Sequence, residues 1–236
     1  MDNSASPYKI SPTQLRELYQ HVWYHNLKIP LFYSMLVGCG YVAWNTSSPF
    51  VEWAMYGAMG YLWMSIVTFM HDCTHSVLFK ARWKNWAFGI FSTLPIIITF
   101  ISFKEDHLEH HRYNRTTKDP DAFTMGKRTA ADFLLFYSYV LIGGVLTILQ
   151  FLLLYPVQKF RGEKLVIHCA ELALRVVVYT GLVLWTMELG VLDHFLKLWL
   201  IPGYIFSLLN SMRFIAEHYD TPWEAGQLEG TRTIVS

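Results

Sequence analysis

Apolar residues gather in six long runs along this chain of 236 residues, and short polar segments separate them. The runs cover residues 30–44, 52–70, 86–103, 132–155, 172–187 and 195–209. A helix of about 20 apolar residues, rising about 1.5 Å per residue, spans the hydrocarbon core of a bilayer. The pattern therefore predicts an all-α, polytopic membrane protein whose helices follow the runs.

The charges between the runs predict how the chain crosses the membrane. Lysine and arginine mark the cytoplasmic side, and they precede the first run, follow the second, and flank the third and fourth. The links 45–49 and 188–194 contain neither residue type, so we place them outside. The N-terminus is then cytoplasmic, and the third and fourth runs start and end on the cytoplasmic side as interfacial or re-entrant helices. The prediction is four transmembrane helices.

Local breakers agree with two returning segments. Pro95 interrupts the third run and Gly143-Gly144 lies at the centre of the fourth, and both residue types favour a bend. Near the starts of the last two runs, we expect the long side chains of Arg175 and Lys197 to reach the membrane interface.

The domain organisation predicted is a short segment followed by one membrane domain. Residues 1–28 form a cytoplasmic or interfacial segment, in which Ser11 caps a helix that continues to Leu27. Residues 29–236 form the membrane domain.

Composition narrows the class of protein. Apolar residues make up 53% of the chain and charged residues 16%, against about 25% charged residues in a soluble domain. The net charge of +1 gives no reason to expect nucleic acid as a partner. Three scattered cysteines show no disulfide pattern, and we expect Cys73 to be a packed thiol.

Two histidine clusters carry the candidate chemistry. They are His71-x-x-x-His75, at the end of the second run, and His107-x-x-His110-His111, just after the third. Residues three and four apart share one face of a helix, and imidazole is the commonest metal-binding side chain. Because the predicted topology places both clusters on the cytoplasmic side, they predict one metal centre.

Other histidines and polar residues are either added to this predicted centre or excluded from it. The topology brings His218, after the sixth run, beside the clusters as a further ligand. The pair His21 and His25 copies the first spacing but has no third ligand near it in the sequence, so we do not assign it to the centre. We expect His168 to lie at the membrane interface. Ligating imidazoles commonly hydrogen-bond a neighbouring polar group, and the candidates for that role are Asp72, Glu109, Glu217 and Asn210.

These motifs resemble those of the membrane fatty acid desaturase superfamily. The resemblance covers roughly residues 50–236 and rests on four segments. They are His71-Asp72-Cys73-Thr74-His75, His107-Leu108-Glu109-His110-His111-Arg112-Tyr113, Asp119-Pro120-Asp121 and Arg213-Phe214-Ile215-Ala216-Glu217-His218. It implies a non-haem di-iron centre held mostly by histidines, oxygen-dependent attack on a C–H bond of a lipid acyl chain, and a separate electron-donor protein.

One part of the family pattern is not found. Members have a third box, another His-x-x-His-His, beyond the position of His218, and this sequence has no histidine after His218. We therefore expect residues 29–236 to lack that box and one metal site to be incomplete, which leaves open whether the chain is an enzyme. The alternatives to a desaturase are a lipid or carotenoid hydroxylase or ketolase, and an inactive, truncated desaturase-like membrane protein.

Overall fold

The computed structural model describes residues 11–14, 23–120, 129–218 and 221–224. Helices dominate these residues, and no strand occurs within them. In chain order the elements are η1 (Trp23–Leu27), α2 (Lys28–Asn45), α3 (Pro49–Thr74), α4 (Arg82–Thr93), α5 (Phe100–Tyr113), α6 (Ala130–Leu149), the π-helical η2 (Gln150–Leu154), α7 (Tyr155–Lys159), α8 (Glu163–Glu188) and α9 (Leu192–His218). The predicted all-α fold is confirmed.

The helix starts follow local sequence signals. Ser11 Oγ accepts the backbone N–H of Gln14 at 3.2 Å, and Gln14 Oε1 accepts that of Ser11 at 2.9 Å. This reciprocal pair is a capping box, as predicted for Ser11. Residues 15–22 of the helix expected here lie outside the described part of the chain, and residues 23–27 form a 3₁₀ turn. Pro49 opens α3, where its missing N–H costs nothing.

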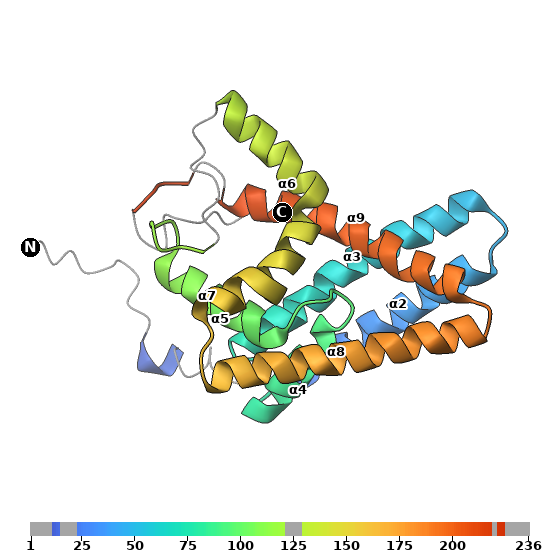
Figure 1. The fold of residues 1–236 in the computed structure, drawn as a ribbon, viewed down its shortest axis with the longest axis horizontal. Helices are drawn as coiled ribbons and strands as arrows, with labels where there is room; N and C mark the ends of the chain where they lie inside the picture. The colour runs from blue at the N-terminus through green and yellow to red at the C-terminus, as the bar shows by residue number, and fades with distance from the viewer. Residues whose placement is uncertain (1–10, 15–22, 121–128, 219–220, 225–236) are drawn as a thin grey trace, which may run out of the picture.

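Four long helices, α2, α3, α8 and α9, run along the long axis of the molecule (Figure 1). The α2–α3 and α8–α9 links meet at one end, on the right in Figure 1. The C-terminal ends of α3 and α9 lie towards the opposite end, where α5 also lies. Close packing holds the centre, since a Cβ on Gly60 of α3 would meet Ile205 of α9 at 2.6 Å.

The segment from α6 to α7 goes into the bundle and comes back (Figure 1). Its contacts with α9 and α5, in order along the segment, are Tyr139 with Phe214, Gly144 with Ser207, Phe151 with Phe103, and Tyr155 with Glu109. The deepest contact is at Gly144, where a Cβ would lie 2.3 Å from Ser207 Oγ. Glycine is needed there because the two helices touch. Helix α6 nevertheless continues through Gly143-Gly144, and the regular α-helix is interrupted only at Gln150–Leu154, so the predicted bend at the glycines is not found.

Four helical segments in the described residues are long and apolar enough to cross a membrane: Tyr24–Asn45, Ala130–Lys159, Glu163–Glu188 and Leu192–Glu217. The protein is thus an integral, multi-pass membrane protein, with the predicted number of long apolar helices. The predicted set differs in one member, because it contained α3 and treated Ala130–Lys159 as returning. The 26-residue α3 packs between α2 and α9, and its glycines and aromatic residues make it less hydropathic. Which of these segments cross the bilayer stays a prediction.

The third apolar run is broken at Pro95, as predicted. Helix α4 ends at Thr93, residues 94–99 form a turn, and α5 starts at Phe100. The main apolar core lies beside this turn and next to the histidine segment of α3. Its buried members are Phe69, Met70, Cys73, Leu78, Ile98, Phe100 and Phe151. Cys73 is therefore a packed thiol, also as predicted.

Candidate metal centre and lipid pocket

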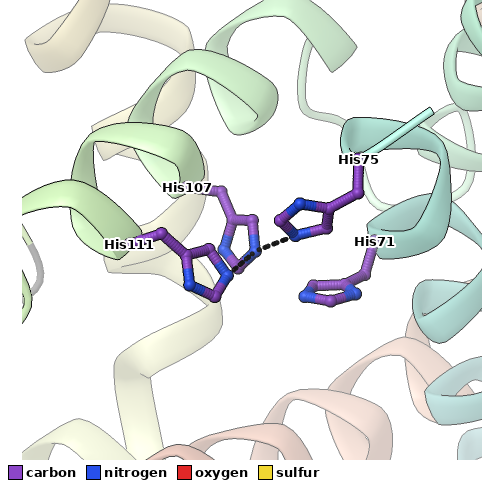
Figure 2. A group of neighbouring side chains, drawn as sticks. All are labelled: His71, His75, His107 and His111. Carbon is purple, nitrogen blue, oxygen red and sulfur yellow. Dashed lines mark hydrogen bonds between the residues drawn. The ribbon is translucent and has the colours of Figure 1, made fainter. Parts of the chain in front are cut away.

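Four of the predicted histidines come together at the facing ends of two helices (Figure 2). The end of α3 supplies His71 and His75, and α5 supplies His107 and His111. One ring nitrogen from each lies within 4.8 Å of those of the others. Each pair has a spacing of four residues, so each presents its rings on one helical face, and packing brings the two faces together.

The contacts within this four-histidine cluster are short. His107 Nε2 lies 2.8 Å from His111 Nε2 and 3.2 Å from His75 Nε2. The rings of His71 and His107 have centroids 4.5 Å apart. Asp72 Oδ1 lies 3.6 Å from His71 Nδ1, which is outside hydrogen-bond range. Converging imidazole nitrogens at these distances form a set of donors for one metal ion.

The electrostatics of the cluster favour neutral imidazoles. Burial, reinforced by the neighbouring histidines, lowers the pKa of His107 to about 2. Burial also lowers the pKa of His75 and of His111, with the adjacent histidines adding to the effect. Only the neutral ring can ligate a metal, so these side chains are ready donors at neutral pH. Neutral nitrogen donors suit zinc, copper, iron and nickel.

His110 and His218 have different surroundings. His110 is buried, and its Nδ1 lies 2.8 Å from Asp119 Oδ1. The second carboxylate oxygen of Asp119 accepts the backbone N–H of Arg115 at 2.7 Å. A carboxylate in this position fixes the tautomer of an imidazole and leaves Nε2 for a metal. His218 ends α9, and its side chain lies outside the described part, so both residues remain predicted ligands.

Asp119 is a site residue that sequence reasoning undervalued. In the pattern Asp119-Pro120-Asp121 it looks like a turn signal, and it does begin to close the turn after α5. Its carboxylate nevertheless contacts His110, nine residues earlier. The resemblance to the desaturases included this segment and was the only sequence signal that pointed to it.

Two acids predicted to support the histidines have other partners. Glu109 accepts hydrogen bonds from Lys159 Nζ at 2.6 Å and from Tyr155 Oη at 3.0 Å. These contacts tie α5 to α7. Glu217 lies 3.2 Å from Arg213 Nε, one turn earlier on α9. Their predicted role beside the histidines remains a prediction.

An apolar pocket of about 290 Å³ lies below the cluster, between α3, α6, α9 and the turn 94–99. Phe103 of α5 lines it and stacks on His107, with ring centroids 5.5 Å apart and planes 5° from parallel. Met70, which immediately precedes His71, also lines it. Most of the polar side chains of the wall belong to α9, among them Asn210, the amide predicted to support the metal site. The pocket therefore reaches residues that adjoin the histidines, although no histidine among the described residues lines it.

The turn that lines this pocket is tied to two other helices. Trp199 Nε1 of α9 donates to the carbonyl of Pro95 at 2.7 Å. The hydroxyl of Tyr179, on α8, donates to the carbonyl of Leu94. Ile97 has a φ of 59°, which costs a β-branched residue energy and persists where the surroundings impose it. These bonds hold the turn that forms one wall of the pocket.

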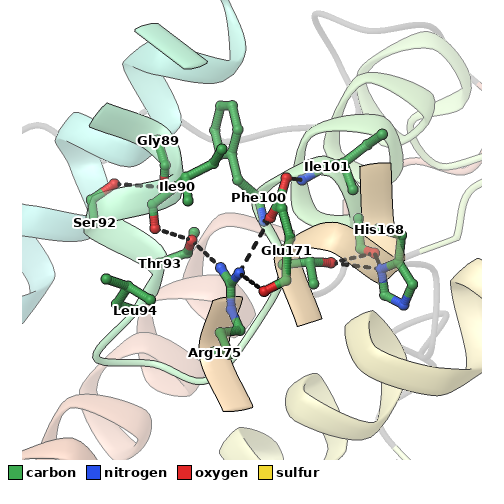
Figure 3. A network of polar contacts seen from close by, with 12 residues as sticks. Gly89, Ile90, Ser92, Thr93, Leu94, Phe100, Ile101, His168, Glu171 and Arg175 are labelled. Atoms are coloured by element: carbon green, nitrogen blue, oxygen red, sulfur yellow. Dashed lines mark hydrogen bonds and ion pairs between the residues drawn. The ribbon is translucent and has the colours of Figure 1, made fainter. Parts of the chain in front are cut away.

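The start of α5 is held by a buried carboxylate from α8 (Figure 3). Glu171 accepts the backbone N–H groups of Phe100 at 2.6 Å and Ile101 at 3.2 Å. The first N–H groups of a helix have no partner within the helix. The negative charge of a carboxylate there also interacts favourably with the positive end of the helix dipole. A side chain 70 residues away thus caps the helix that carries His107 and His111.

Arg175 completes this arrangement, and the expectation that it reaches the interface was wrong. It is 3% exposed, and it donates to Thr93 Oγ1 at 2.6 Å and to the Glu171 carbonyl at 2.9 Å (Figure 3). Its ion pair with the Glu171 carboxylate, at 3.4 Å, compensates the buried charge. The guanidinium stays inside because α4 and α8 supply acceptors there. Lys197, which has no such surroundings, is exposed and pairs with Asp193 at 2.7 Å.

His168 was also wrongly expected at the interface. It is 4% exposed, and its Nδ1 lies 3.0 Å from Thr99 Oγ1 and 3.1 Å from Ser102 Oγ. These hydroxyls belong to the first turn of α5 and its cap. The sequence did contain a signal for a buried polar group in this helix. Glu171 and Arg175 are a charged pair four residues apart in an apolar helix, and intramembrane charges are rarely unpartnered.

Comparison with known proteins agrees with this site. The family described as Fatty acid desaturase matches residues 47–236. Among curated proteins, the sphingolipid delta(4)-desaturase DES1 of Homo sapiens is 39% identical over 69 residues, which are 26% of this chain and 21% of that protein. The putative sphingolipid delta(4)-desaturase/C4-monooxygenase of Caenorhabditis elegans is 43% identical over 47 residues, 19% of this chain and 13% of that protein. The matched part thus spans about a fifth or less of the length of these relatives. Because the family match covers most of the sequence, the chain belongs to the fatty acid desaturase family.

Proposed function

We propose that this protein is an oxygen-dependent oxidoreductase that introduces a double bond into a lipid acyl chain. The observation that carries the proposal is the contact between the two halves of the site: Phe103 lines the apolar pocket and stacks on His107 of the four-histidine cluster. A chain in that pocket lies close to the metal donors. Apolar walls and converging imidazoles together suit oxidation of an unactivated C–H bond.

We propose iron as the metal. The proposed ligands are His71, His75, His107, His110, His111 and His218. When bound, a non-haem iron pair supplies the power to activate dioxygen for removal of hydrogen from an unactivated carbon. The chain itself holds neutral imidazoles in place, orients His110 through Asp119, and keeps the acyl chain away from water.

The pocket supports a role in positioning the substrate. Its volume of about 290 Å³ is near the lower limit of common ligand sites, about 300–1,000 Å³, so it encloses only part of a long chain. The turn 94–99 forms one side of the pocket, and Trp199 holds it in place through the Pro95 carbonyl. We propose that the lipid enters from the membrane beside this turn.

We further propose that the substrate is a sphingolipid. Both relatives named above carry sphingolipid delta(4)-desaturase in their names. In this chain, Ser207, Asn210 and Ser211 give the α9 side of an otherwise apolar pocket three hydrogen-bonding groups. Such groups suit the hydroxyl and amide functions of a sphingolipid, which a plain hydrocarbon chain does not have.

Hydroxylation is the second candidate reaction. The Caenorhabditis elegans relative is named as both a desaturase and a C4-monooxygenase. Both outcomes start with removal of one hydrogen from the chain. Desaturation removes a second hydrogen, with dioxygen and two electrons from a donor giving two molecules of water, whereas hydroxylation adds one oxygen atom to the lipid and gives one molecule of water.

We propose that the histidine end and the N-terminus face the cytoplasm, where a separate electron-donor protein meets the site. The charges support this orientation. The histidine end has exposed basic residues such as Lys80, Arg112 and Lys118. At the opposite end lie Glu188 and Asp193. A positive excess on one side is the usual mark of the cytoplasmic side.

The test combines metal analysis with product analysis. The purified chain is assayed for iron, and membranes containing it are given a saturated sphingolipid, oxygen and an electron-donor system. Mass spectrometry then separates loss of two hydrogens from gain of one oxygen. We expect bound iron and a desaturated product, both abolished in His107→Ala and both kept in His194→Ala, a histidine at the opposite end. An iron-free protein, or a product unaffected by His107→Ala, would refute the proposal.

A further inference from the structure

Arg115 occupies an unusual position directly after α5. It is an arginine only 3% exposed, although its charge has to be compensated wherever it is buried. Its φ of 57° lies in the left-handed region, which residues other than glycine seldom adopt. Strain of this kind persists only where the surrounding contacts impose it. The contacts of Arg115 therefore show what holds it.

On one side Arg115 binds the segment 221–224, which follows α9. Its Nη2 donates to the carbonyl of Thr221 at 2.9 Å, across 106 residues of sequence. The guanidinium carbon lies 4.9 Å from the ring centre of Trp223. The backbone carbonyl of Arg115 accepts the N–H of Glu224 at 2.9 Å. Three independent contacts thus attach this segment to one residue.

On the other side Arg115 reaches the metal centre. Its backbone N–H donates to Asp119 Oδ2 at 2.7 Å. The other oxygen of the same carboxylate lies 2.8 Å from His110 Nδ1. The left-handed conformation at Arg115 is what allows its N–H to point to Asp119 while its side chain points to Trp223. One residue therefore joins the end of α5 to the segment that follows the end of α9.

We propose that Arg115 is a positioning residue for the metal centre, through which docking of residues 221–224 holds Asp119 and His110 in place. The inference rests on the proposed function in one respect, that His110 takes part in metal binding. Coupling between two sites is reciprocal, so metal bound at the histidines stabilises the docked segment as much as the docked segment favours the metal. We expect lysine not to replace Arg115, because its single ammonium group cannot both lie over the Trp223 ring and donate to the Thr221 carbonyl as the larger guanidinium does.

The first experiment needs no metal. Hydrogen exchange is measured by mass spectrometry on the metal-free protein, as the wild type, Arg115→Lys and Trp223→Ala. We expect both substitutions to speed exchange of the amides in 114–119 by roughly tenfold, because the hydrogen bond to Asp119 opens more often. Exchange within α8 should not change. Unchanged exchange in 114–119 of a folded Trp223→Ala protein would overturn the proposed joint.

The second experiment measures Fe(II) directly. Replacing a group that orients a metal ligand usually weakens metal affinity about 10–100-fold, so we expect Arg115→Lys and Trp223→Ala to bind Fe(II) at least about tenfold more weakly than the wild type. Fe(II) should also slow exchange of the Glu224 amide in the wild type and not in Arg115→Lys. Arg161→Lys is the matched control, since Arg161 also donates to backbone carbonyls, those of Val157 and Phe160.

The two proposals fail differently in these experiments. A wild type that binds no Fe(II) refutes the proposed function, and exchange in 114–119 still decides whether Trp223 and Arg115 hold Asp119. A wild type that binds Fe(II), with Arg115→Lys and Trp223→Ala folded and equally tight, leaves the proposed function standing and overturns the role of Arg115. Equal weakening in Arg161→Lys would also overturn it, because the effect would then belong to any arginine bound to backbone carbonyls.

Discussion

Both ends of α5 carry polar side chains, but these side chains have different kinds of partners at the two ends. At the N-terminal end, Glu171, Arg175 and His168 are less than 5% exposed and bond to the backbone or hydroxyls of α4 and α5 (Figure 3). At the C-terminal end, His111 is exposed and His107 half-buried, and their nitrogens converge on those of α3 (Figure 2). Buried polar groups that satisfy one another stabilise a fold. The converging histidine nitrogens at the C-terminal end are all of one chemical kind, so they are instead available to bind a ligand.

The N-terminal end of α5 also serves the C-terminal end. The histidines are useful only if α5 holds a fixed position against α3, and the polar contacts at the start of α5 contribute to that position. The Glu171 cap sets the axial position of α5, and Phe100, fully buried beside it, sets its rotation. Damage to the first end should therefore lower stability first and metal binding as a consequence, whereas damage to the second should lower metal binding alone.

The largest effect is expected from Glu171→Ala. It leaves the buried guanidinium of Arg175 without its carboxylate and two N–H groups of α5 without an acceptor. Removal of one partner of a buried ion pair costs about 3–5 kcal/mol. Thermal and denaturant unfolding in detergent measure the loss, and iron content should fall with it.

Glu105→Ala is the matched control for that change. Glu105 also links α5 to α8, through Lys164 Nζ at 2.6 Å, but this pair is partly exposed. Such pairs contribute about 0–1 kcal/mol. If the two variants lost equal stability, the distinction between a buried cap and a surface ion pair would not hold.

Gly89→Ala tests the position of Phe100 and has an intermediate effect. A Cβ on Gly89 of α4 would lie 2.4 Å from two atoms of the Phe100 ring, so the ring has to move. Overpacking a filled core costs about 1–3 kcal/mol, and we expect a lower melting temperature together with weaker iron binding.

Gly181→Ala provides the control for that substitution. Gly181 lies in α8, and a Cβ added there would have no neighbouring atom within 4 Å. Alanine is favoured over glycine in a helix by about 0.5–1 kcal/mol, so the substitution should be neutral or stabilising. A loss of stability in Gly181→Ala as large as in Gly89→Ala would show that helix flexibility, and not contact with Phe100, is responsible.

His111→Ala should have the smallest effect on stability. The side chain is exposed, and surface substitutions change the free energy of unfolding by about 0.5 kcal/mol or less. Iron content should nevertheless fall to background, because one of four converging donors is gone. Metal analysis and thermal unfolding of the same sample check both statements. A large drop in the melting temperature of the metal-free variant would mean that this end of α5 is also structural.

Much of this arrangement was predictable because it is local. The apolar runs predict the helices, Pro95 predicts the break between α4 and α5, and the four-residue spacings predict that His71 pairs with His75 and His107 with His111. Each inference needs only the geometry of one helix. The predicted helix from 132 to 155 shows the limit, because the structure changes to a π turn at Gln150–Leu154 and no local signal marks it.

The sequence by itself determined that this is a helical membrane protein with two histidine pairs, and tertiary structure decided what holds them. Spacing along a helix fixes which side chains share a face, but not which other helix that face meets. Arg175 and His168 were therefore assigned to the interface, whereas α4 and α5 supply them with acceptors inside the protein. Arg115 likewise meets the carbonyl of Thr221 only because the segment that follows α9 lies against the end of α5. Contacts across 70 to 106 residues depend on how the helices pack, and only the folded chain contains that information.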